Sequence, residues 1–300
     1  MKKKTYLFAL MAMALTLGSC SDNENGIGGE TSKYITVSTS IGNMTRVATD
    51  EKGGQTFEEG DEISVYAWTG APTVAPETSE RVVNNAINKL TNGSWISTPQ
   101  MLWKNNREKH YFIGVYPTAA ISDLSAGEYT FDANKQTESD LLVAVNPDGL
   151  SYSADAQQTV PLTFTHVMAK LAVNLTYKNQ WGGIPTVEKV VVGNAAKEAT
   201  INYLTKVVTP STTAKEDFSL PEITENTKYV SVIIPQEEVK QLTIVIGGKN
   251  FVYDNGTPFK LESGKITTVN LEVGRDEIKL GDVKITDWED GSTFSGEAIN

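Results

Sequence analysis

The side chains that most often perform chemistry in proteins are few in this chain and lie far apart. It contains one cysteine, Cys20, and two histidines, His110 and His166. A zinc site built from Cys and His needs more such ligands, and a lone cysteine cannot form an intrachain disulfide. We therefore predict no metal site and no structural disulfide.

Neither histidine lies in a catalytic motif. A serine hydrolase usually places its nucleophile within G-x-S-x-G, and the sequence has neither this segment nor a phosphate-binding glycine motif. No spacing selects a carboxylate pair for glycoside hydrolysis. We expect His166, within an apolar run, to be a hydrogen-bonded core residue, and His110, after a charged turn, to lie at the surface. The prediction is a protein without enzyme activity and without a cofactor.

The clearest chemical signal is N-terminal. Basic residues 2–4 precede an apolar run over residues 6–17, which is too short to span a bilayer permanently. Residues 17–20, Leu-Gly-Ser-Cys, resemble a bacterial lipobox, in which the signal peptide (here 1–19) is removed and the thiol of Cys20 receives a diacylglycerol. An ordinary signal peptide with an incidental cysteine is the alternative. We predict an outer-membrane lipoprotein at the cell surface, anchored through acyl chains such as palmitate.

A tether is expected after the lipobox, followed by an acidic folded part. Residues 20–32 are polar and glycine-rich and cannot bury themselves. The formal charge of the whole chain is −11, and removing the three lysines of the signal leaves 23 basic against 37 acidic residues, a charge near −14. That charge repels nucleic acid, so no nucleic-acid partner is expected.

The rest of the chain predicts an all-β fold. Short β-rich runs recur between Gly, Pro, Asn and Asp residues, as in β-sandwiches. Residues 81–90 are the only candidate helix, and their pattern fits a polar strand equally well. The expected strands cover residues 34–41, 63–68, 111–116, 141–145, 162–177, 187–192, 229–234, 242–246, 251–253, 266–273 and 283–288.

The run 160–177 is too long for one strand, and its apolar residues change parity between Phe164 and Val167. Because side chains alternate strictly along a strand, this change indicates a bulge or a passage from one core to another. We therefore place a domain boundary near residue 158, between domains at 33–157 and 158–300.

Aromatic residues leave two readings open. Sugars stack on exposed rings, which would suit a glycan-binding surface, but β-sandwich cores also use Trp and Tyr heavily. We favour the core or a domain interface. The rings concerned are Tyr66, Trp68, Trp95, Trp103, Tyr111, Tyr116 and Trp181.

Several segments, in their order along the chain, resemble the Bacteroidetes fimbrillin family, which includes subunits of type V pili. The opening segment 57–66 has the pattern F-x-x-G-D-x-I-x-V, and the most specific segment is 162–171 (LTFTHVMAKL). The other matching segments are 111–117, 140–144 and 285–291.

The resemblance implies two tandem transthyretin-like β-sandwich domains and a lipoprotein precursor. In pilus-building members, an Arg-specific protease cuts beyond the first strand, and the C-terminal segment of a neighbouring subunit replaces that strand. Arg46 stands at the corresponding place, so that Val47 would begin the processed chain; an exposed loop arginine that is never cut is the alternative. Other pilus subunits are the implied partners, and a host or glycan receptor is left open.

Two structural predictions follow. The strand at 34–41 should turn Ile35, Val37 and Ile41 inward and be removable. Trp288 should pack into the C-terminal domain, with a bulge at Asp287, because its spacing from Val283 and Ile285 is odd. The predicted function is a structural and adhesive subunit of a pilus, at its tip, anchor or stalk, assembled by strand addition. The alternative is a surface glycan-binding module for nutrient uptake.

Overall fold

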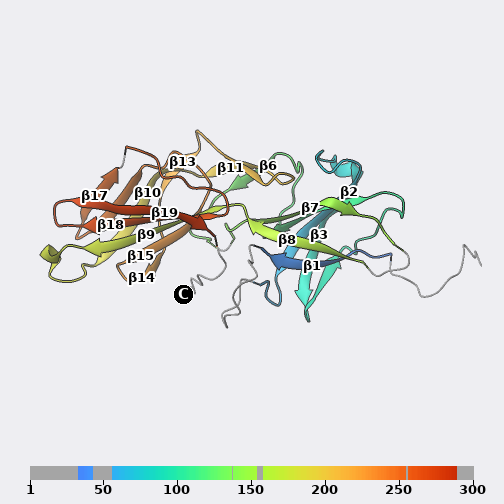
Figure 1. Ribbon diagram of the computed structural model, residues 1–300, viewed down its shortest axis with the longest axis horizontal. Helices are drawn as coiled ribbons and strands as arrows, with labels where there is room; N and C mark the ends of the chain where they lie inside the picture. The colour runs from blue at the N-terminus through green and yellow to red at the C-terminus, as the bar shows by residue number, and fades with distance from the viewer. Residues whose placement is uncertain (1–32, 43–55, 137, 154–157, 255, 289–300) are drawn as a thin grey trace, which may run out of the picture.

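The computed structural model describes residues 33–42, 56–136, 138–153, 158–254 and 256–288. Within these ranges the chain forms strands β1 to β19 and two short 3-10 helices, η1 (Thr78–Glu80) and η2 (Asn179–Trp181). The all-β prediction is confirmed, and residues 81–90 lie in a strand and not in a helix. Figure 1 shows the sheets arranged in two groups along the long axis of the molecule.

One group is dominated by a seven-stranded sheet with the order β1-β8-β7-β5-β2-β3-β4. Its strands come from the first 166 residues, and all neighbours are antiparallel except β1 and β8, which run parallel. The strands are β1 (Thr36–Ile41), β2 (Glu62–Thr69), β3 (Arg81–Thr91), β4 (Ser94–Thr98), β5 (His110–Tyr116), β7 (Leu142–Leu150) and β8 (Thr159–His166).

The other group holds a five-stranded sheet, β14-β15-β9-β18-β19, and a four-stranded sheet, β13-β10-β16-β17. A three-stranded sheet, β12-β11-β6, connects the groups, because β6 precedes β7 in the chain and pairs with β11. The strands are β6 (Gly127–Thr130), β9 (Ala169–Tyr177), β10 (Val187–Ala196), β11 (Glu198–Asn202), β12 (Val207–Pro210), β13 (Lys215–Ser219), β14 (Glu222–Thr224), β15 (Lys228–Ile233), β16 (Gln241–Ile246), β17 (Lys249–Asp254), β18 (Lys265–Val273) and β19 (Ile278–Asp287).

The chain passes from one group to the other between β8 and β9. Strand β8 ends at His166 in the seven-stranded sheet, and β9 begins at Ala169 in the five-stranded sheet. This passage explains the parity change seen in the sequence, since each strand alternates toward a different core. Because β8 pairs with β1 and β7, the chain changes sheet after β8, at residues 167–168. The domain boundary near residue 158 remains a prediction.

The central strands of the seven-stranded sheet are buried on both faces. In β2, Ile63, Val65 and Ala67 belong to a cluster on one face, together with apolar residues of β1 and β8. Tyr66 and Trp68 belong to a larger cluster on the other face, which continues into the second group of sheets. This double burial explains why β2 reads as a nearly continuous apolar run.

Two features are absent from the described part of the chain. No helix there has the length and apolar character needed to cross a membrane. In the same residues, no group of three or more His, Cys, Asp or Glu side chains is placed to hold a metal ion.

Candidate functional site: the edge strand and the junction beside it

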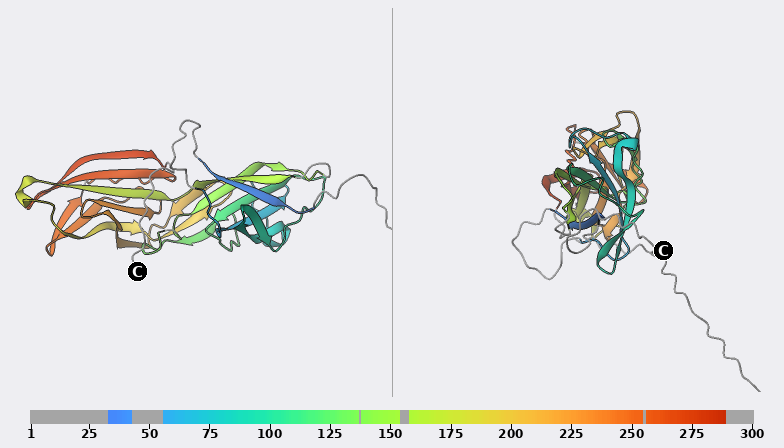
Figure 2. Two further views of the ribbon diagram at one scale, coloured as in Figure 1. Left: turned by 90° about the horizontal axis from the view of Figure 1, so that it is seen from below. Right: turned by 90° about the vertical axis from the view of Figure 1, so that its right-hand side faces the viewer.

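Strand β1 forms one edge of the seven-stranded sheet. Its only strand partner in the described structure is β8, in the parallel register Thr36 opposite Thr159 to Ile41 opposite Phe164. Figure 2 shows β1 in blue along the outside of this sheet. Side-chain hydroxyls reinforce the ladder, with 3.1 Å between Ser40 Oγ and Thr163 Oγ1.

The side chains of β1 alternate as predicted. Ile35 and Val37 are buried, at 2% and 6% exposure, and Ile41 is half-buried against the same cluster. Ser38 and Ser40 are exposed. The strand therefore covers part of a hydrophobic core with only a few side chains and presents a polar face to solvent.

The other side of this segment contacts the chain that follows β4. The backbone N–H of Ile35 donates to the carbonyl of Met101 at 2.9 Å, and the N–H of Trp103 donates to the carbonyl of Lys33 at 3.2 Å. Further along, the indole N–H of Trp95 donates to Thr39 Oγ1 at 3.0 Å. The segment therefore connects the two ends of the sheet, since β1 and β4 are the terminal strands of its order.

The beginning of β8 depends on β1 for its pairing. Strand β7 pairs only with the end of β8, where Leu142 lies opposite His166 and Ala144 opposite Phe164. Residues 159–163 pair with β1 alone among the described strands. Withdrawing β1 would thus leave this half of β8 without a sheet partner on either side.

Apolar residues lie beneath the edge strand. Val160, Leu162 and Phe164 of β8 are fully buried in the cluster that Ile35 and Val37 complete. The ring of Phe57 packs edge-on against Phe164, with centroids 5.1 Å apart. Removal of β1 would therefore uncover an apolar groove as well as unpaired backbone groups.

Phe164 occupies its place because the facing residue of β5 is glycine. A Cβ atom built on Gly114 would lie 2.6 Å from Phe164 Cζ, too close for two non-bonded carbon atoms, so the ring would have to shift. Gly114 and Phe164 come from two of the segments, 111–117 and 162–171, that the sequence singled out separately. Their contact gives these segments a common role in shaping the core under β1.

A second cluster lies where β8 meets the end of β19. The indole of Trp288 is 3% exposed and stacks on His166, with centroids 3.9 Å apart and planes 7° apart. Lys170 Nζ lies 4.0 Å from the centroid of the indole ring, and His166 Nδ1 is 2.8 Å from Asp140 Oδ1. The prediction that His166 is a hydrogen-bonded core residue is confirmed.

Trp288 is buried as predicted, but the expected bulge at Asp287 is wrong. The irregularity in the β18–β19 pairing lies between Asn270 and Leu271. Val283 and Ile285 are exposed whereas Trp288 is buried, so the three side chains have different surroundings without a bulge at 287. Sequence reasoning recognised the segments around Asp140, His166 and Trp288 but not that they meet, because no local pattern records such a contact.

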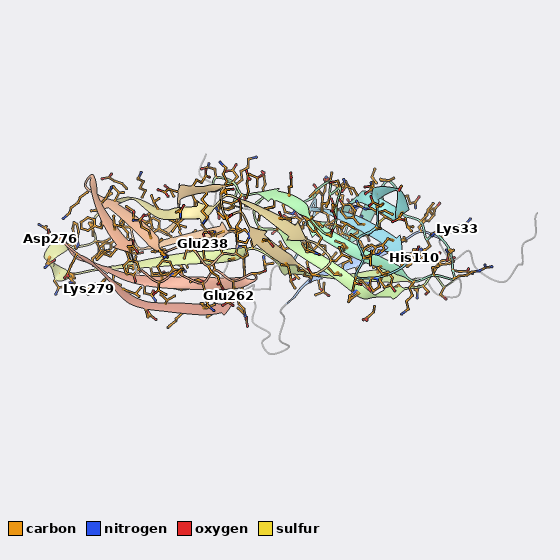
Figure 3. The ribbon with its side chains drawn as sticks, turned by 90° about the horizontal axis from the view of Figure 1, so that it is seen from above. Lys33, His110, Glu238, Glu262, Asp276 and Lys279 are labelled. Atoms are coloured by element: carbon orange, nitrogen blue, oxygen red, sulfur yellow. The ribbon has the colours of Figure 1, made fainter. Side chains whose placement is uncertain are left out.

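The surface placement expected for His110 is wrong. His110 is fully buried, 5.0 Å between centroids from the ring of Trp103. Its Nε2 accepts the backbone N–H of Lys104 at 3.0 Å, so Nδ1, 3.2 Å from the carbonyl of Glu108, carries the proton. Burial lowers the pKa of His110 and keeps the imidazole neutral. His110 and Lys33 lie at the same end of the molecule (Figure 3).

The rings that suggested a glycan platform belong mainly to the core. Tyr66, Trp68 and Trp103 are buried, and the hydroxyl of Tyr66 accepts a hydrogen bond from the backbone N–H of Ile121 at 2.9 Å. The remaining rings of that set, Trp95, Tyr111, Tyr116 and Trp181, are half-buried and pack against one of the two clusters. No observation on these rings favours the glycan-binding alternative.

Three predicted site residues lie outside the described residues: Cys20, Arg46 and Val47. Their lipidation and processing remain predictions. The nearest described neighbours of Arg46 in sequence are the end of β1 at Ile41 and Gly42, whose N–H donates to the carbonyl of Phe164 at 2.9 Å.

Solved structures share this fold. A candidate cell adhesion protein from Bacteroides uniformis superposes with a TM-score of 0.63 at 19% identity, covering 86% of this chain and 100% of its own. A second, from Bacteroides ovatus, has a TM-score of 0.62 at 18% identity and covers 85% and 98%. A fimbrial protein from Bacteroides vulgatus has a TM-score of 0.53 at 12% identity and covers 86% and 100%.

Sequence comparison identifies the family. Among curated protein sequences, none is significantly similar to this chain. The sequence model of the Fimbrillin-like family, by contrast, matches residues 45–288, which include nearly every described strand. The resemblance seen in the sequence is therefore confirmed, and the chain belongs to the fimbrillin-like family.

Proposed function

We propose that this protein is a surface lipoprotein subunit of a pilus, in which β1 is exchanged for a strand of a neighbouring subunit. Membership of a non-enzymatic adhesion and fimbrial family supports the broader assignment. The finer assignment rests on the position of β1. This edge strand completes an apolar core and is the only sheet partner of residues 159–163 among the described strands.

The energetics of β1 suit a strand that is replaced. Fully burying an aliphatic side chain contributes about 1.5–3 kcal/mol, so Ile35 and Val37 together supply roughly 3–6 kcal/mol. A whole domain is typically stable by about 5–15 kcal/mol. Loss of β1 therefore removes a large fraction of the stability, and a strand with similar apolar alternation would restore it by β-strand addition.

The two residues proposed for anchoring and processing, Cys20 and Arg46, both precede β2 in the sequence. Cys20 would carry the lipid that holds the precursor at the outer membrane, and a diacyl group gives stable attachment where a single chain does not. Cleavage after Arg46 would separate β1 and the lipid anchor from the rest of the chain, which would begin at Val47. The tip, anchor and stalk positions of a pilus all remain compatible with this arrangement.

The N-terminal sequence of the mature protein isolated from the cell surface tests the proposal. A start at Val47 in assembled material, and a start at Cys20 in the Arg46→Ala variant, are the expected results. Cys20→Ala should prevent correct maturation and membrane attachment. Assembled fibres whose subunits still begin at Cys20 would contradict strand exchange, and membrane fractionation unchanged by Cys20→Ala would contradict the anchor.

A second experiment tests whether the groove beneath β1 takes up a strand of another subunit once β1 is released. Cutting the purified protein with a trypsin-like protease should release the segment containing β1 and produce larger species under native sizing. A matched Arg46→Ala sample, which keeps all other basic residues, should stay intact at this position and monomeric. If the cut protein remains a stable monomer with the segment bound, the chain is a fimbrillin-like protein that does not assemble in this way.

A further inference from the structure

Strand β12 forms a second open strand edge, in a different sheet from β1. This strand is the terminal member of the sheet β12-β11-β6 and borders a groove of about 550 Å³. The opposite wall consists of residues 235–238 and 261–263, and β11 contributes no lining residue. Figure 3 shows Glu238 and Glu262 of this wall near the middle of the molecule.

The outer edge of β12, which borders this groove, carries backbone groups that do not pair with β11. The N–H of Ser211 donates to the carbonyl of Glu198 at 2.8 Å, which makes this a hydrogen-bonded pair of the antiparallel ladder. Because such pairs alternate with non-bonded ones, the N–H and C=O of Val208 and the C=O of Pro210 point away from β11. The outer edge thus has one free donor and two free acceptors in the described structure, in the arrangement that an added strand requires.

The opposite wall is held in place by its own hydrogen bonds. Gln236 and Leu261 exchange both backbone hydrogen bonds, at 2.9 and 3.0 Å. The buried side chain of Gln236 also accepts the N–H of Ala196 at 2.9 Å and donates to the carbonyl of Ile234 at 3.0 Å. The groove therefore lies between two fixed backbone segments, and its apolar lining includes Val208, Pro210 and Leu261.

The charges along the groove are mainly negative. Glu237, Glu238 and Glu262 line it against a single cation, Lys206. Lys206 Nζ donates to Thr165 Oγ1 at 3.0 Å, and burial lowers the pKa of its ammonium group. Glu238 is paired with Lys215, whereas Glu237 and Glu262 are exposed and have no ion pair among the described residues. These two carboxylates would attract a basic residue.

We propose that this groove binds an extended segment of a partner protein in which apolar residues alternate with lysine or arginine. The segment adds to the outer edge of β12 through the Val208 and Pro210 backbone groups. Its apolar side chains fill the groove toward Leu261, and its basic side chains approach Glu237 and Glu262. Because β12 and β1 share no pairing partner, this site functions independently of the exchange of β1.

The test uses short capped peptides that alternate valine with lysine and threonine, with fluorescence anisotropy of a labelled peptide as the readout. Two matched peptides carry glutamate in place of lysine, or N-methyl groups along one backbone edge. We expect saturable binding of the lysine peptide, at least tenfold weaker binding of the glutamate peptide, and no binding of the N-methylated peptide. Hydrogen exchange at the Val208 amide should slow when the lysine peptide binds.

Variants of the protein separate local from general charge effects. The double variant Glu237→Lys and Glu262→Lys should weaken binding about tenfold, because each exposed charge contributes modestly. Glu225→Lys with Glu272→Lys changes the net charge equally at exposed positions outside the groove and should alter binding less than twofold. Absence of saturable binding to the wild type, equal effects of the two double variants, or equal binding of the N-methylated peptide would each overturn the proposal.

Discussion

Truncation of Ile35 to alanine should loosen β1 selectively. Ile35 is 2% exposed in the cluster beneath the edge strand, and its side chain packs with apolar residues of β8. Its backbone N–H bonds to Met101 and is retained in the variant, so Ile35→Ala removes packing and leaves the hydrogen bond in place.

The expected magnitude follows from the burial. Truncating a buried isoleucine to alanine typically costs about 2–5 kcal/mol, and we expect about 2–4 kcal/mol for an edge strand, where the surroundings can relax. Since each 1.4 kcal/mol is a factor of ten, the population with β1 detached should rise by a factor between about 30 and several hundred. Ser38→Ala is the matched control, because Ser38 is exposed in the same strand and should change stability by less than about 0.5 kcal/mol.

Native-state hydrogen exchange measures this opening strand by strand. In the wild type, amides of β1 and of residues 159–163 should share one opening free energy that is lower than that of β2 and β5, because no described strand other than β1 pairs with this half of β8. Ile35→Ala should lower that shared value by about 2–4 kcal/mol. A single free energy common to all four segments would refute the reasoning, since β1 would then open only when the whole sheet unfolds.

Three further predictions concern single side chains. Trp288→Ala should lower the free energy of unfolding by about 3–5 kcal/mol in urea titrations, because it removes a buried ring stacked on His166. Trp288→Phe should lower it less. A wild-type free energy for Trp288→Ala would show that the stack is not stabilising. Gly114→Ala should cost about 1–3 kcal/mol by pressing on Phe164, and an unchanged melting temperature would contradict the contact. Because the folded-state pKa of His110 is lowered below its unfolded value near 6.5, its contribution to stability is present above that pH and is lost as the pH falls. The unfolding free energy should therefore fall more between pH 7.5 and 5.5 in the wild type than in His110→Gln, and parallel pH profiles would refute this.

The sequence by itself determined the features that depend on local patterns. The alternation of Ile35, Val37 and Ile41 with Thr36, Ser38 and Ser40 predicted β1 and its buried face, because the side-chain period of a strand is two. The parity change after Phe164 predicted a bulge or a passage between cores for the same reason. The segments shared with the fimbrillin-like family identified the family, since their order along the chain is itself a property of the sequence.

Only the tertiary structure decided which strands and side chains meet. The side chains of Thr36 and Thr159 lie in contact although 123 positions separate them in the chain, and no local pattern specifies that pairing. His110 follows a charged turn and reads as a surface residue, yet Trp103 and the backbone of residues 104–108 fold over it. The stack of Trp288 on His166 and the groove beside β12 arise in the same way. Alternation specifies which face of a strand is buried. Which strands pair with each other depends on how the whole chain packs, and no local segment contains that information.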